Sequence, residues 1–165
     1  GDAAVYPAFA PFTRLAEAKT TDAAQRFETV LAALEATHDY VLVDTPPVAA
    51  NQAVAAVTAS DAVAAVVPPG DRGVDSLQRV RGRLADVGAD CDLVVANRAA
   101  ETPPDADLAV PEHDETGIPA APVALDATGA FAASVAAVAE SLFDSDLAVD
   151  FTDASVLDAA REKLA

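Results

Sequence analysis

Apolar positions follow two patterns along this chain, a helical repeat and short continuous runs. Residues 22–37 show the first, with apolar side chains at the i, i+3, i+4 and i+7 spacing of an amphipathic helix: Phe27, Val30, Leu31 and Leu34. Thr21 or Asp22 stands in position to cap this helix. Similar patterns predict helices over residues 73–87 and 128–143 and a short one over 153–164, and the Ala-rich composition of residues 50–59 predicts another.

Short apolar runs bounded by turn residues predict buried strands between these helices, at residues 40–43, 62–67, 93–96 and 108–110. Alternation of helices with near-continuous apolar strands is typical of a parallel sheet. The chain is therefore expected to form an α/β fold of three layers, with helices on both faces of the sheet. Residues 1–150 are expected to form one domain, and residues 151–165 a helical tail.

Composition adds information on how the core packs and on which partners are excluded. The chain has 165 residues, the size of one domain, and its 52% hydrophobic content is mostly Ala and Val, so small side chains must pack closely. The formal net charge of -17 is typical of a halophilic surface, because molar salt screens the self-repulsion, although a merely acidic protein is the alternative. This charge argues against direct contact with nucleic acid, since Arg79, Arg81 and Arg83 are spread around a helix.

The cysteine and histidine content and the lengths of the apolar runs exclude further classes of protein. The single cysteine, Cys91, excludes an internal disulfide and is expected to be a small buried residue, and His113 is expected to face solvent. No apolar run approaches the roughly 20 residues needed to cross a bilayer, and no signal peptide opens the chain. We therefore expect a cytoplasmic protein without membrane contact.

Polar side chains follow the predicted strands. Asp44, Asn97, Arg98 and Glu112 each come after a strand end, so a parallel sheet would gather them at its carboxyl edge, where ligands bind in such folds. Asp44 is followed by Thr45, Pro46 and Pro47, which cannot continue a strand. This edge is the candidate site.

The order of these segments resembles the MinD/ParA family of P-loop ATPases. The similar segments are "VYPAF" at 5–9, "DYVLVDTPP" at 39–47, "SDAVAAVVPP" at 60–69, "VVANR" at 94–98, "VPEHDETGIPAAPV" at 110–123 and "GAFAASVAAVAESL" at 129–142. In this resemblance the segment at 39–47 is similar to the Walker B strand and switch II. The bacterial tyrosine kinases that share this core carry a tyrosine-rich tail, whereas this chain has two tyrosines.

The resemblance implies roles for particular residues. Asp44 would act in catalysis by orienting water around Mg²⁺, and Pro46 and Pro47 would stiffen a switch that senses the γ-phosphate of ATP. Asn97 would bind the adenine edge, with Arg98 stacked or paired beside it and Pro111 and Glu112 flanking the base from the other side. The alternatives are that Asp44 caps a turn and that Asn97 is an ordinary turn residue.

One part of the family pattern is missing. No G-x-x-x-x-G-K-[ST] loop occurs, because Gly70, Gly73 and Gly82 lack both the spacing and a following Lys. We therefore expect weak or no ATP hydrolysis from this chain. In the family the P-loop strand lies beside the Walker B strand, so without it residues 40–43 would expose an apolar edge that needs cover.

Three functions remain open at this point. The chain is the larger part of a MinD/ParA-type ATPase for cell division or cargo positioning, a degenerate scaffold that binds a protein partner, or a structural domain without a small ligand. The first two imply a protein partner or a homodimer. The tail has nearly balanced charge, so it is expected to pack or bind a partner rather than a membrane.

Overall fold

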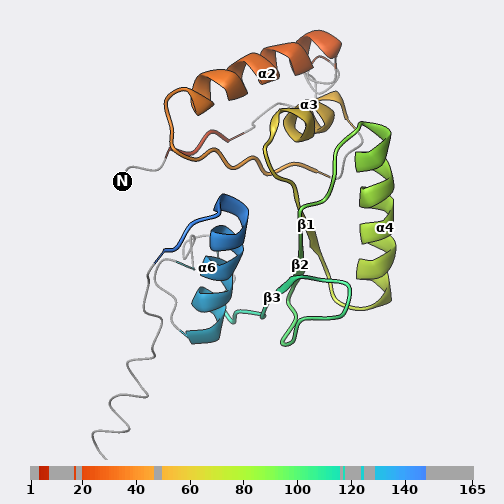
Figure 1. Ribbon diagram of the computed structural model, residues 1–165, viewed down its shortest axis with the longest axis vertical. Coiled ribbons are helices and arrows are strands. Elements are labelled where there is room, and N and C mark those ends of the chain that lie inside the picture. Colours follow the sequence, from red (N-terminus) through yellow and green to blue (C-terminus); the bar gives the residue numbers. More distant parts are fainter. Residues whose placement is uncertain are drawn as a thin grey trace, which may run out of the picture. The chain divides into compact units, whose positions relative to one another are not determined.

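The computed structural model of the protein describes residues 4–7, 17, 20–46, 50–115, 117, 124 and 129–147. The chain divides into two compact units, the first formed by Gly1–Asp61 with Arg83–Ala89, and the second by Ala62–Gly82 with Asp90–Ala165 (Figure 1). The predicted tail at residues 151–165 lies outside the described residues. None of the described helices is both long and apolar enough to cross a bilayer.

Helices α2 (Thr21–Glu35) and α3 (Asn51–Ala59) belong to the first unit and pack against each other. Both were predicted, but the cap of α2 is Thr20, whose Oγ1 accepts a hydrogen bond from Ala23 N at 3.2 Å. The expected cap at Thr21 or Asp22 is wrong by one or two residues, because the local backbone and not the residue type selects the capping position. The buried side chains of α3 are small, namely Ala53, Ala55, Ala56 and Val57.

Residues 40–43 belong to no strand, which corrects the prediction made for them. A strand forms only where a neighbouring strand shares its backbone hydrogen bonds, and in the described part of the chain the sheet consists of three other strands. The Leu42 side chain is 76% exposed. This apolar segment is therefore extended chain that forms no strand. Its sequence alone did not ensure that its side chains would be buried.

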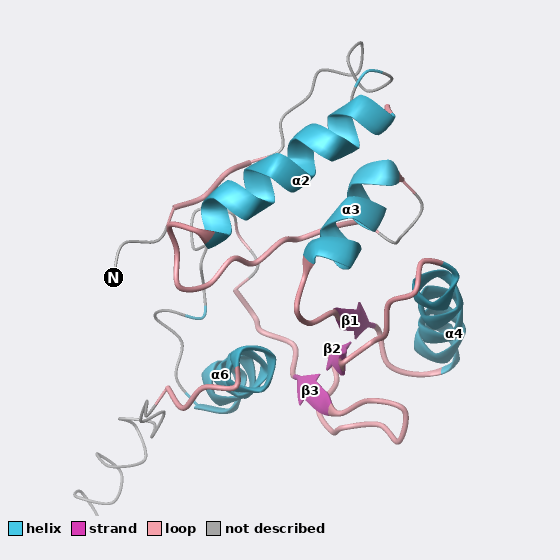
Figure 2. Ribbon diagram, turned by 45° about the horizontal axis from the view of Figure 1, so that its top comes forward, coloured by secondary structure: helices cyan, strands magenta, loops and turns pink. Residues whose placement is uncertain are grey.

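The second unit is built on a parallel sheet of β1 (Ala64–Val67), β2 (Leu93–Asn97) and β3 (Leu108–Val110), in that order. Ala65 pairs with Val94 and Val95 pairs with Leu108. Helices α4 (Asp71–Asp86) and α6 (Gly129–Phe143) lie on opposite sides of this sheet (Figure 2). The expected α/β architecture with a parallel sheet and helices on both faces is confirmed for these three strands.

The core of this unit lies between the sheet and α4. Leu77 of α4 packs with Ala65, Val67 and Val94, and the half-buried Cys91 contacts the same cluster. On the other face α6 contacts β2 and β3. Because the strands carry small side chains, the single large side chain of this cluster, Leu77, fills much of the space between the layers.

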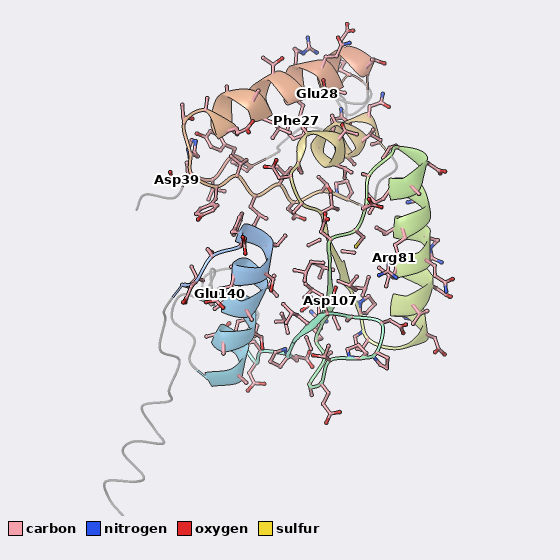
Figure 3. The ribbon with its side chains drawn as sticks, viewed as in Figure 1. Phe27, Glu28, Asp39, Arg81, Asp107 and Glu140 are labelled. Atoms are coloured by element: carbon pink, nitrogen blue, oxygen red, sulfur yellow. The ribbon has the colours of Figure 1, made fainter. Side chains whose placement is uncertain are left out.

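Two aspartates fix the amino ends of the strands. Asp92 Oδ2 accepts a hydrogen bond from Val63 N at 2.8 Å, and Asp107 Oδ2 accepts one from Val94 N at 2.7 Å. Asp107 N also donates to Val94 O at 2.9 Å, and Asp107 lies beside the sheet (Figure 3). A charged acceptor strengthens such bonds, so these contacts hold the register that places the opposite, carboxyl ends of the strands.

Candidate functional site

The carboxyl ends of β2 and β3 bring four of the predicted residues together. Asn97, the last residue of β2, pairs in register with Val110, and Ala99 N donates a hydrogen bond to Val110 O at 3.0 Å. These backbone contacts place Asn97 and Arg98 beside the segment that begins with Pro111 and Glu112. Asn97, Arg98 and Glu112 are exposed and Pro111 is half-buried, so the side chains are accessible to a ligand.

Arg98 is held in a left-handed backbone conformation, with φ of 60°. This conformation turns the chain after β2 so that the next residue, Ala99, is buried and reaches Val110 O. A left-handed backbone costs a residue with a Cβ about 1 kcal/mol, and such strain collects at functional positions. The left-handed backbone of Arg98 therefore lowers the free energy of unfolding of the chain.

Substitution of Arg98 by glycine is expected to raise the free energy of unfolding by about 0.5–1 kcal/mol, because glycine adopts this backbone conformation without a Cβ clash. Urea denaturation in molar KCl measures the change. Arg81→Gly is the control, since Arg81 is exposed within α4, where glycine is expected to cost about 1 kcal/mol. Equal destabilisation by both variants would contradict the assignment of strain to Arg98.

His113 is half-buried and packs against α6, so the expectation that it faces solvent holds only in part. Its ring lies 4.6 Å from the Phe131 ring, centroid to centroid, with a tilt of 49°, and its Nδ1 is 3.1 Å from Glu115 N, a donor. Glu115 Oε1 in turn accepts a hydrogen bond from Gly117 N at 2.9 Å. These contacts hold the loop after β3 against α6 and so help to position Pro111 and Glu112.

The role of His113 was not predicted, and the sequence carried only a weak signal for it. Phe131 stands in the first turn of the helical pattern at 128–143, on its apolar side, but nothing in the local sequence ties it to residue 113. Contacts between residues so far apart depend on how the loop and helix meet. The described residues contain no group of three or more His, Cys, Asp or Glu side chains suited to a metal ion.

Asp44 and its neighbours belong to the first unit, whereas the other candidate residues belong to the second. Asp44 and Pro46 are exposed, Thr45 is half-buried and Pro47 lies outside the described residues. Asp44 does not follow a strand of the sheet, because residues 40–43 form none. Its juxtaposition with Asn97, and its role toward Mg²⁺, therefore stay predictions.

The fold defines the second unit as a parallel α/β unit with an exposed polar edge at its carboxyl strand ends, where ligands bind in such folds. Comparisons of the chain with protein-family models, with curated proteins and with solved structures found no match.

Proposed function

We propose that this chain is part of a MinD/ParA-like nucleotide-binding domain, of the class that positions cell-division machinery or other cargo, and that Asn97 and Arg98 bind the base of ATP. The observation that carries the proposal is the pairing of Asn97 with Val110, which sets Asn97 and Arg98 beside Pro111 and Glu112. Ligands of parallel α/β sheets bind outside the carboxyl ends of the strands, where these residues lie.

The chemistry of the four residues suits an adenine base. The Asn97 amide offers one donor group and one acceptor, which matches the alternating donor and acceptor on the adenine edge. The Arg98 guanidinium is planar and stacks on aromatic faces, and the apolar ring of Pro111 offers a second surface. Glu112 accepts hydrogen bonds. Together these exposed groups suit a flat, nitrogen-rich ligand such as a base better than a ligand that offers only negative charge.

The phosphates have no comparable site in the described residues of the second unit. The turn from Gly70 into α4 has a single glycine with a left-handed φ, Gly70, and the helix carries Asp71 in its first turn, whose charge repels a phosphate. Gly73 faces the carbonyl of Pro68. We therefore propose that this chain hydrolyses ATP weakly or not at all, and that Mg²⁺, if bound with ATP, involves Asp44.

Titration of adenosine and of ATP with Mg²⁺ by calorimetry tests the proposal. Molar KCl is the suitable medium, because a net charge of -17 self-repels in dilute buffer. Asn97→Ala is expected to weaken adenosine binding about tenfold, the effect of about 1.4 kcal/mol from hydrogen bonds lost to the base. Asp44→Asn is expected to weaken Mg²⁺·ATP and leave adenosine unchanged.

Gln78→Ala is the matched control for Asn97→Ala, since Gln78 is an exposed amide on α4 of the same unit. It is expected to leave both affinities unchanged. Absence of adenosine and ATP binding to the unaltered chain, or equal binding by Asn97→Ala, would sink the proposal.

A second candidate function is a non-catalytic module that binds a protein partner. It is favoured by a separate observation, the exposed apolar edge of β1. Either function is proposed to operate in the cytoplasm, with a protein partner or a second copy of the chain.

A further inference from the structure

β1 is the edge strand of the sheet, with β2 as its one neighbour among the described residues. Val63, just before β1, directs both of its backbone groups toward β2: Val63 N donates to Asp92 Oδ2 and Val63 O accepts from Leu93 N at 3.3 Å. Backbone groups of successive residues in a strand point to opposite sides. The N–H and C=O groups of Ala64 and Val66 therefore face the outer edge of the sheet.

The same strand exposes an apolar side chain. Val66 is 63% exposed, while its neighbours Ala65 and Val67 are 6% and 8% exposed. Ala65 and Val67 pack with Leu77 of α4, so strand alternation puts the Val66 side chain on the opposite face of the sheet, the face on which α6 contacts β2 and β3. Strands of parallel sheets are normally covered on both faces, so this uncovered valine is unusual.

β1 itself carries few of the features that block unwanted pairing. It is short and is followed by Pro68 and Pro69, but its four residues are two alanines and two valines in regular register with β2, without a lysine, a proline or a bulge. An edge with outward backbone groups, an apolar side chain and no blocking residue within the strand is suited to accept a further strand.

The charge of the chain points to the nature of that strand. Asp71 is exposed after the carboxyl end of β1, next to the exposed Arg72, and Asp92 is exposed at the amino end of β1 on its β2 side, within a chain of net charge -17. A second copy would bring an equal negative charge to the edge, whereas Lys or Arg beside an incoming strand would be attracted. Charge complementarity thus favours a partner other than this chain itself.

We propose that the outer edge of β1 binds a strand of a partner protein by sheet addition, with apolar residues in the middle of that strand and Lys or Arg on its flanks. The backbone groups of Ala64 and Val66 supply the hydrogen bonds, and Val66 supplies apolar contact. This proposal goes beyond nucleotide binding and does not depend on it, because β1 contributes no residue to the edge around Asn97.

Fluorescence anisotropy with a synthetic peptide tests the proposal on the full chain. The probe is a fluorescein-labelled peptide of alternating Val and Thr with two lysines at each end. Two control peptides are matched to it, one with alternate backbone amides N-methylated and one with glutamates in place of the lysines. We expect the unaltered chain to bind the probe and to bind each control about tenfold more weakly.

The dependence of peptide binding on salt concentration separates the contribution of the lysine charges from that of the backbone hydrogen bonds. The difference between the lysine and glutamate peptides is expected to be large at about 0.1 M KCl and to shrink at about 1 M, where the Debye length falls from about 10 Å to about 3 Å. The loss caused by N-methylation is expected at both concentrations, because it removes backbone hydrogen bonds.

Val66→Pro is the decisive variant. Proline removes the N–H that faces the outer edge and leaves the hydrogen bonds between β1 and β2 in place, so probe binding is expected to fall about tenfold or more. Val66→Thr keeps the N–H and is expected to bind within about threefold of the unaltered chain. Should Val66→Pro fail to fold, as judged by circular dichroism, Val66→Lys replaces it, since lysine blocks an edge and repels the probe.

Three results would overturn the proposal: no binding of the probe by the unaltered chain, equal binding of the N-methylated peptide, or unchanged binding by folded Val66→Pro or Val66→Lys. Light scattering adds a fourth. A dimer of the unaltered chain that becomes a monomer in Val66→Lys would assign the edge to a second copy. Adenosine titration of Val66→Thr and Val66→Lys separates this proposal from the nucleotide proposal, because neither change is expected to alter adenosine affinity.

Discussion

Gly73→Ala is expected to lower the free energy of unfolding by about 2–4 kcal/mol. A Cβ at this position would overlap the backbone carbonyl oxygen of Pro68, and a carbonyl cannot rotate away as the end of a long side chain can. Gly73 N also donates to Gly70 O at 2.8 Å, so the turn that would have to move is closed by its own hydrogen bond. Urea denaturation in molar KCl, followed by circular dichroism, measures the loss.

Gly82→Ala is the control for this experiment, because Gly82 lies in the same helix and a Cβ there would meet nothing within 4 Å. It is expected to raise the free energy of unfolding by about 1 kcal/mol, as alanine loses less backbone entropy than glycine in a helix. The two glycines of α4 should thus respond in opposite directions. A small effect at Gly73, or the same sign at both positions, would show that α4 does not begin against Pro68.

Leu77→Ala is expected to lower the free energy of unfolding by about 2–5 kcal/mol. The Leu77 side chain is 3% exposed and packs on Ala65, Val67 and Val94. These neighbours are too small and too firmly held in the sheet to fill the space that an alanine would leave, so a cavity is expected to remain. The measurement is again urea denaturation at fixed salt.

Leu42→Ala makes the same chemical change at a site that is 76% exposed. It is expected to alter stability by less than about 0.5 kcal/mol, because an exposed leucine loses little burial when it is shortened. A large loss at Leu42 would show that residues 40–43 are buried in the folded chain. In that case the original strand prediction for this segment would be reinstated.

Different parts of the candidate site were predictable to different degrees. Asn97 and Arg98 were expected beside Glu112 because strand ends in a parallel sheet share an edge, and β2 and β3 meet that expectation. The same reasoning applied to Asp44 required residues 40–43 to be a strand. A continuous apolar run identifies a segment that can pair, but only a neighbouring strand makes it do so.

The loop after β3 was likewise predictable in part from the sequence. Its polar composition indicated an exposed segment, and Glu112 is indeed exposed. His113, one residue further, packs on Phe131 of α6, a residue well separated in sequence. The strain at Arg98 was likewise unpredictable, because the left-handed conformation follows from the need of Ala99 N to reach Val110 O.

By itself the sequence determined the approximate positions of α2, α3, α4 and α6 and of β1, β2 and β3, as well as the parallel α/β class. Hydrophobic periodicity, glycine stops and proline turns act over a few residues, so they can be read locally. Only the tertiary structure decided that Thr20 caps α2, that residues 40–43 form no strand and that β1 is the edge among the described strands. Each of these outcomes depends on which distant backbone groups come within hydrogen-bonding distance, and no local pattern specifies that.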